Sequence, residues 1–228
     1  LYIDQIDSLM NNLMDTSIKV KRISAKDYSN SIEANSISTD NRIAVIYAMG
    51  EITNGSGDEF TIGTENLIKE LKRARDNKRV KSIVIRVNSP GGSPLTSDLI
   101  WREIKNIKSE KPVIISMSEV AASGGYYISA SANKIVAEPF SLTGSIGVYG
   151  ILPNAEKFFD NKLGVTFDGV QTSKNSNLGS FTAPLNEFQK QFFQKQVDDI
   201  YFDFVEKVAE GRNCLLYTSP SPRDRTRS

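Results

Sequence analysis

Histidine is absent from all 228 residues of the sequence. The chain therefore cannot build a Ser-His-Asp triad, a catalytic Cys-His pair or a His-ligated metal site. Any hydrolase here needs a different general base. The acidic residues are scattered, and the glycine turns lack the spacing of a phosphate-binding loop, so we expect neither a metal nor an organic cofactor.

Cysteine and excess charge are also scarce. Cys214 is the single cysteine, so no intrachain disulfide can form. The net charge of +1 gives no reason to expect a concentrated basic face, and we expect no nucleic-acid partner.

No stretch of the sequence approaches the roughly 18 to 20 consecutive apolar residues of a membrane helix. Because the sequence begins at Leu1 rather than Met, we expect a preceding segment that could include a membrane anchor.

Strand-like and helix-like patterns alternate through the middle of the chain. Short apolar runs predict buried strands, and amphipathic stretches predict a helix from Thr64 to about residue 77 and another that begins at Thr96 or Ser97. This alternation predicts a layered α/β domain with a parallel sheet. The expected strands lie at 43–47, 82–87, 112–117, 134–137 and 146–150.

The two ends differ from this middle region, residues 39–213. Residues 1–38 have the pattern of an amphipathic helix and a linker, which we interpret as the tail of a preceding domain. An integral N-terminal helix of the same domain explains that pattern equally well. Residues 214–228 resemble a translated sequencing adapter, the alternative being a native disordered tail.

Within the middle region, the stretch 186–210 predicts a last helix. Its apolar stripe, from Phe188 and Phe192 to Phe204 and Val208, is expected to pack on the core.

Two glycine-containing turns follow the second and third expected strands. They are Ser89-Pro90-Gly91-Gly92 and Ala121-Ala122-Ser123-Gly124-Gly125. Ligands bind at the carboxyl ends of strands in open parallel sheets. Adjacent glycines let a substrate come close, and their N–H groups can converge on an oxyanion. Ser123 precedes a helix-like segment, so from the residues alone it is either a nucleophile or, more commonly, a helix cap.

Three motifs together carry a family resemblance. In order and spacing, Arg86–Gly92, Ala121–Ile128 and Leu142–Val148 resemble the signal peptide peptidase, or protease IV, family over roughly residues 42–213. The resemblance implies an α/β fold of stacked β-β-α repeats, related to the Clp protease subunit and to crotonase. It also implies a bacterial inner-membrane protein that faces the periplasm, assembles as a homo-oligomer and degrades the remnants of cleaved signal peptides.

The resemblance further implies a Ser–Lys dyad. Ser123 would be the nucleophile, and the backbone N–H groups of Gly91, Gly92 and Gly124 would bind the oxyanion. A lysine serves as the base only when its pKa is held well below about 10.4. Lys174 lies 51 positions after Ser123 and is one candidate. In the family's long form the first of two tandem halves supplies the lysine. We favour this second arrangement, in which the chain is the C-terminal catalytic half, truncated at both ends, and the lysine lies in a missing half.

Two other functions remain open. A crotonase-type acyl-CoA enzyme would use the same oxyanion hole on a thioester, although the residues around Ser123 argue against it. A non-catalytic assembly half of a larger peptidase is the second alternative, since a serine without its base hydrolyses little.

Overall fold

The computed structural model describes residues 40–214. The interpretations of residues 1–38 and of the tail after Cys214 lie outside this range. Within it, no helix combines the length and apolar character that a membrane crossing requires.

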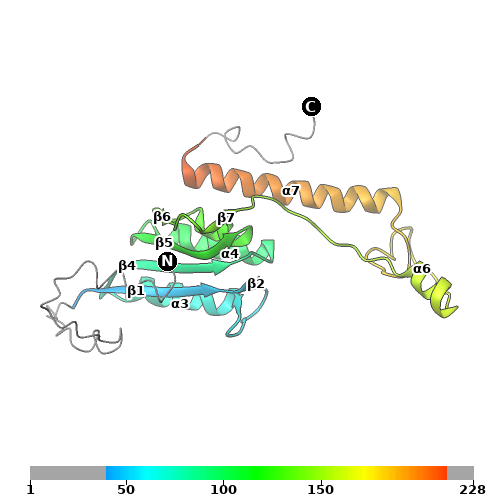
Figure 1. Cartoon of the computed structure of the whole chain (residues 1–228), viewed down its shortest axis with the longest axis horizontal. Helices are drawn as coiled ribbons and strands as arrows, with labels where there is room; N and C mark the ends of the chain where they lie inside the picture. The colour runs from blue at the N-terminus through cyan, green and yellow to red at the C-terminus, as the bar shows by residue number, and fades with distance from the viewer. Residues whose placement is uncertain (1–39, 215–228) are drawn as a thin grey trace, which may run out of the picture. The chain divides into compact units, whose positions relative to one another are not determined.

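A parallel sheet forms the centre of the described structure (Figure 1). Its strands run in the order β1 (Arg42–Met49), β4 (Val80–Ser89), β5 (Val113–Ala122) and β6 (Lys134–Val136), and β7 (Leu142–Gly144) also pairs with β5. Every pairing is parallel. A second small parallel sheet consists of β2 (Glu51–Thr53) and β3 (Thr61–Gly63). The predicted α/β class is confirmed.

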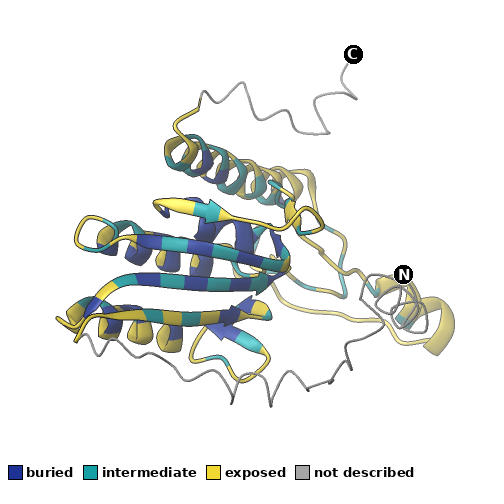
Figure 2. Ribbon diagram, turned by 60° about the vertical axis from the view of Figure 1, so that its left-hand side comes forward, coloured by how far each residue is buried: buried dark blue, intermediate teal, exposed yellow. Residues whose placement is uncertain are grey.

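The core lies between the large sheet and three helices. These are α3 (Thr64–Asp76), α4 (Pro94–Ile107) and α5 (Gly124–Ser129). Along β4, fully buried Ile83, Ile85 and Val87 alternate with partly exposed residues, as a sheet with one covered face requires (Figure 2). Ile100 and Ile104 of α4 are also fully buried. One continuous hydrophobic cluster therefore fixes the strands beneath the helices.

Several boundaries differ from the sequence prediction, and β5 continues past the expected end at Met117 to Ala122. The expected strand at 146–150 is wrong, because the strand lies at Leu142–Gly144 and ends where Gly144 and Ser145 take positive φ values of 85° and 50°. Helix α4 begins two residues earlier than expected, at Pro94. Its N-cap is Ser93, whose hydroxyl accepts a hydrogen bond from the Thr96 N–H, and proline is favoured at the first helical position.

The last helix, α7 (Glu187–Arg212), is only partly packed. Phe204 and Val208 are buried as expected, but Phe188 and Phe192 are 58% and 41% exposed. The N-terminal part of α7 extends away from the sheet toward α6 (Glu156–Phe158) and the π-helix η1 (Phe159–Leu163) (Figure 1). The expectation that the whole stripe packs on the core is therefore wrong for its first half.

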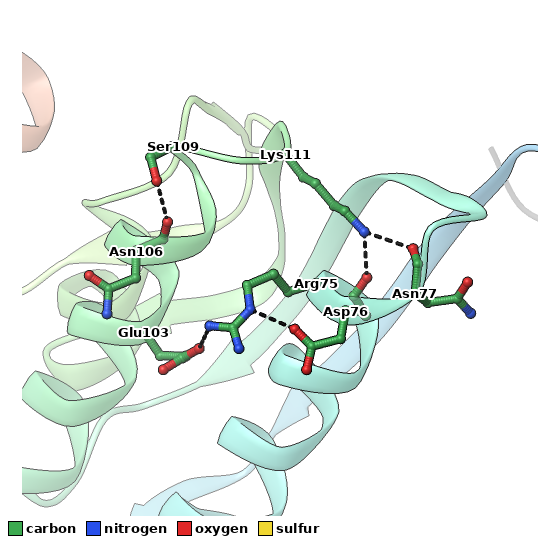
Figure 3. Close-up of polar contacts among 8 residues, drawn as sticks. Arg75, Asp76, Asn77, Glu103, Asn106, Ser109 and Lys111 are labelled. Carbon is green, nitrogen blue, oxygen red and sulfur yellow. Dashed lines mark hydrogen bonds and ion pairs between the residues drawn. The ribbon is translucent and has the colours of Figure 1, made fainter.

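Side chains from the α4–β5 connection stabilise the end of α3 (Figure 3). The Lys111 Nζ donates to the carbonyl oxygens of Ala74 at 3.1 Å and Asn77 at 2.8 Å. The last carbonyls of a helix have no partner within it, so the lysine both satisfies them and complements the helix dipole. Nearby, Arg75 bridges Asp76 and the buried Glu103 of α4.

Replacing Lys111 should therefore weaken the contact between α3 and the sheet. We expect Lys111→Ala to lower the free energy of unfolding by about 1 to 3 kcal/mol, because two charge-assisted hydrogen bonds are lost. The control is Lys72→Ala, which removes an exposed lysine of α3 itself. It should change the free energy of unfolding by less than about 0.5 kcal/mol. Urea unfolding of both variants measures the difference, and equal effects would contradict the capping role.

Candidate active site

Ser123 occupies a strained turn between β5 and α5. Its φ and ψ angles are 50° and −119°, and a positive φ is uncommon for any residue other than glycine. Such a conformation costs on the order of 1 to 3 kcal/mol and persists only where its surroundings enforce it. Here the Ser123 N–H donates to the Gly144 carbonyl, and the Ser123 carbonyl accepts from the Tyr127 N–H, both at 2.9 Å. A strained strand-to-helix turn of this kind exposes the serine Oγ, as in the nucleophile elbow of hydrolases.

The structure does not support a capping role for Ser123. Its side chain makes no cap hydrogen bond to α5. Within residues 40–214 its hydroxyl has no hydrogen-bond partner, and the half-buried residue lines a cavity of about 890 Å³. The hydroxyl is therefore free to react with a molecule bound in the cavity.

The two glycine turns meet directly beneath this serine. Residue Ser89 of β4 pairs with Ala121 of β5, so the two strands end side by side. Gly91 has a φ of 106°, and a Cβ there would lie 2.7 Å from the Gly124 N and 2.8 Å from the Ser123 Cβ. Only glycine allows this approach. The sequence-predicted group of Ser123, Gly91, Gly92 and Gly124 is thus brought together around one cavity.

The three glycines differ in how free their N–H groups are. The Gly91 N–H donates to the Ser89 Oγ at 3.2 Å. In the described part of the chain, the N–H groups of Gly92 and Gly124 have no partner. The N–H groups of Gly92 and Gly124 are therefore available to a bound molecule, whereas the Gly91 N–H would have to exchange its bond to Ser89.

Strand β2 holds the first glycine turn in place. The Ile52 N–H donates to the Gly91 carbonyl at 2.7 Å, and the Ser93 N–H donates to the Ile52 carbonyl at 2.8 Å. These bonds fix both ends of the Gly91–Gly92 segment. No local pattern in the sequence indicates this tether, because it joins segments about 40 residues apart.

The cavity wall includes residues that the sequence did not reveal. Ser145, with its φ of 50°, lies in the third motif but was assigned to no site. Its place directly after Gly144 and two residues before Gly147 is the one signal that could have found it. Most of the remaining wall is aromatic or aliphatic and comes from α5, the 146–149 segment and α7: Tyr127, Ile146, Val148, Tyr149, Ile200, Tyr201 and Phe204.

No lysine among residues 40–214 lines the cavity. Lys174 lies on an exposed loop away from it. Lys207 is closer, with its Nζ 5.7 Å from the centre of the Tyr127 ring, but it pairs with Asp98 at 3.0 Å. Burial alone would lower the pKa of Lys207, yet its hydrogen bonds with Tyr127 and Asp98 raise that pKa above the ordinary value. A raised pKa is the opposite of what a lysine base requires.

Tyrosines of α5 join the serine's helix to α7. The Tyr127 hydroxyl donates to Asp98 at 2.9 Å, and its ring packs on Phe204 with centroids 4.7 Å apart. The neighbouring Tyr126 hydroxyl accepts from Arg212 at 2.8 Å. Helix α7 thus supplies part of the cavity wall and is bonded to the helix that follows Ser123.

Comparison with known families agrees with this geometry. Residues 105–218 match the model of peptidase family S49, and residues 43–141 match that of Clp protease. The chain belongs to peptidase family S49. The Clp protease match covers the sheet strands β1, β4, β5 and β6 and the serine turn, in agreement with the predicted fold relationship.

Several curated proteins resemble this S49 chain. It is 40% identical to Protease 4 of Haemophilus influenzae over 173 residues, which cover 75% of the chain and 28% of the relative. It is 41% identical over 177 residues to the chloroplastic serine protease SPPA of Arabidopsis thaliana, covering 75% and 26%. The putative signal peptide peptidase SppA of Enterococcus faecium is 37% identical over 170 residues, covering 74% and 48%. The chain thus spans a quarter to a half of the length of these relatives.

Contact between the glycine turns should make Gly91 intolerant of any side chain. Gly91→Ala should lower the free energy of unfolding by about 2 to 5 kcal/mol, through backbone strain and overlap with Ser123 and Gly124. The matched control is Gly55→Ala, which also has a positive φ, 83°, but has no atom within 4 Å of an added Cβ. It should cost only about 1 to 2 kcal/mol. Equal losses in chemical denaturation would show that the contact with the serine turn does not matter.

The bond between Tyr127 and Asp98 should give the domain an alkaline limit. Burial raises the pKa of Tyr127, with the bond to Asp98 adding to the effect. A raised folded-state pKa gives stability that is complete below about pH 10, the ordinary tyrosine value, and is lost as the pH rises further. Tyr127→Phe should therefore be less stable than the unsubstituted chain by about 1 to 2 kcal/mol at pH 7. That gap should shrink above about pH 10, and a constant gap between pH 8 and 11 in thermal unfolding would contradict this role.

Proposed function

We propose that this S49 domain carries the nucleophile and the oxyanion hole of a serine-type endopeptidase whose base is a lysine. The supporting observation is that Ser123 lies on a strained turn and lines one cavity with Gly92 and Gly124. Within residues 40–214, the Ser123 hydroxyl and the N–H groups of Gly92 and Gly124 have no hydrogen-bond partner. A nucleophile and oxyanion donors around one reacting carbonyl are what acyl transfer requires.

The proposed reaction has two acyl-transfer steps. The base removes the Ser123 proton as the Oγ attacks the peptide carbonyl carbon, and the N–H groups of Gly92 and Gly124 receive the negative charge on the carbonyl oxygen. The base then gives the proton to the leaving amine as the C–N bond breaks. Water, deprotonated by the same base, hydrolyses the acyl-enzyme ester and restores the serine.

For the base, we propose a lysine from outside residues 40–214. This is supported by a cavity without a lining lysine, by the exposed position of Lys174 and by the raised pKa of Lys207. A base of this kind needs a lowered pKa, so the lysine should become desolvated when it reaches the cavity. The long-form arrangement, in which a preceding half provides it, fits a chain that covers 28% of Protease 4.

The substrates that we propose are apolar peptides, including remnants of cleaved signal peptides. The apolar wall formed by Tyr149, Ile200 and Phe204 suits such side chains. One relative is named as a putative signal peptide peptidase.

We further propose that the protein is located at the bacterial inner membrane and faces the periplasm. In this proposal it is attached through a segment outside this chain and assembles as a homo-oligomer. In this view residues 39–213 are the peptidase domain, 1–38 end a preceding domain, and 214–228 are not native.

Neither alternative function accounts for the site as well. A crotonase-type enzyme uses the oxyanion hole but does not need a free serine hydroxyl on a strained turn. The assembly-half alternative agrees with the proposal on one point, because no lysine among residues 40–214 lines the cavity with Ser123.

Peptide cleavage by the protein extended upstream to a full S49 peptidase tests this proposal. Ser123→Ala should lower kcat/KM by about 10⁴-fold or more, because no nucleophile remains. Lys174→Ala should stay within about twofold of the unsubstituted protein, as expected for a solvent-exposed charge. Ser173→Ala, an exposed serine on the Lys174 loop, is the matched control. Loss of turnover in Lys174→Ala would identify Lys174 as the base, and full activity in Ser123→Ala would end the peptidase proposal.

A further inference from the structure

Glu51 is the one charged residue that lines the Ser123 cavity in the described part of the chain. Every other lining residue is neutral. Within residues 40–214 the Glu51 carboxylate takes part in no hydrogen bond and no ion pair, and the residue is exposed. A carboxylate without a partner, at a cavity that also holds the nucleophile, is available to a ligand.

The backbone on both sides of Glu51 is fixed. Gly50 donates its N–H to the Asn88 carbonyl at 2.9 Å, and Ile52 exchanges hydrogen bonds with Gly91 and Ser93. Ile52 is 1% exposed, so its side chain enters the core. Successive side chains of a strand alternate, which turns Glu51 away from the core and toward the cavity. The carboxylate therefore occupies a set position, one residue from the strand segment that holds the oxyanion turn.

Its electrostatic surroundings favour a cation. Among residues 40–214, no lysine or arginine lines the cavity to neutralise Glu51, and much of the wall is apolar. Beside a low-dielectric wall, a charge interacts more strongly with a bound ion than it would in open water. The same carboxylate repels an anionic peptide, so one residue contributes both attraction and exclusion.

We infer that Glu51 determines specificity by binding a lysine or arginine side chain of the peptide. This inference rests on the proposed function, because it assumes that the cavity binds peptides. Together with the apolar wall from α7, it describes a substrate that carries apolar residues and a positive charge close to the scissile bond.

Binding of synthetic peptides to this chain tests the inference without requiring turnover. The probes are octapeptides of alanine and leucine with blocked ends and a neutral dye, each carrying lysine, norleucine or glutamate at one position moved along the peptide. Fluorescence anisotropy gives the Kd. At the best position, lysine should bind about three- to tenfold more tightly than norleucine, which is the range of a partly desolvated charge pair. This preference should fall in 1 M salt.

Variants assign the preference to Glu51. Glu51→Gln should abolish the lysine preference and leave norleucine binding unchanged, whereas Glu51→Lys should favour the glutamate peptide. The control is Glu119→Gln, an exposed carboxylate on β5 that does not line the cavity, and it should retain the preference. Exposed substitutions of this kind should leave the melting temperature close to that of the unsubstituted chain.

The outcomes separate this inference from the proposed function. If lysine and norleucine peptides bind equally, or if the preference survives Glu51→Gln, Glu51 does not set specificity, while peptide binding stands. If none of the peptides binds the unsubstituted chain, the peptide-binding cavity itself is contradicted, and the role of Glu51 fails with it.

Discussion

The close contact between two glycine turns is the constraint on which this site depends. Gly91 lies against the Ser123 Cβ and the Gly124 N at distances that leave no room for a side chain at position 91. The parallel register of β4 and β5 brings the turns together, and β2 fixes the first of them. The strain at Ser123 is maintained because its neighbours on both turns, and Gly144 on β7, leave it no relaxed alternative.

The sequence predicted most of the sheet because its strands are short, continuous apolar runs, which a buried parallel sheet requires. The serine and glycine group was predicted only through the family resemblance of three ordered motifs, because adjacent glycines after a strand are by themselves a turn signal and a serine there is more commonly a helix cap. It could not show that the Gly91 N–H is already bonded, that β2 tethers the turn, or that Glu51 and Phe204 share a cavity with Ser123. Those facts depend on contacts between distant segments. The apolar residues at the start of α7 misled for the same reason: helical spacing shows which residues share a face, but not whether anything covers that face.

Electrostatics is the reason why, in the proposed account, the base comes from outside the described residues. A lysine base must lose its proton easily, but Lys207 is held charged by Asp98 and Tyr127. This ion pair joins α7 to Asp98 of α4, which also accepts the hydrogen bond from Tyr127 of α5, so its role is architectural. In the proposed account the chemistry is divided: this domain supplies the nucleophile, the oxyanion donors and the substrate wall, and another part of the protein supplies the base.

The most direct test of this account is the site of covalent labelling by a peptide phosphonate, a probe that reacts with activated serine hydroxyls. The probe is applied to the upstream-extended protein and to this chain alone, and the modified residue is located by mass spectrometry of proteolytic fragments. The account predicts rapid labelling of Ser123 in the extended protein and far slower labelling in the chain alone. Rapid labelling of the isolated chain, or attachment of the probe to Ser97 or Ser145 in place of Ser123, would contradict it.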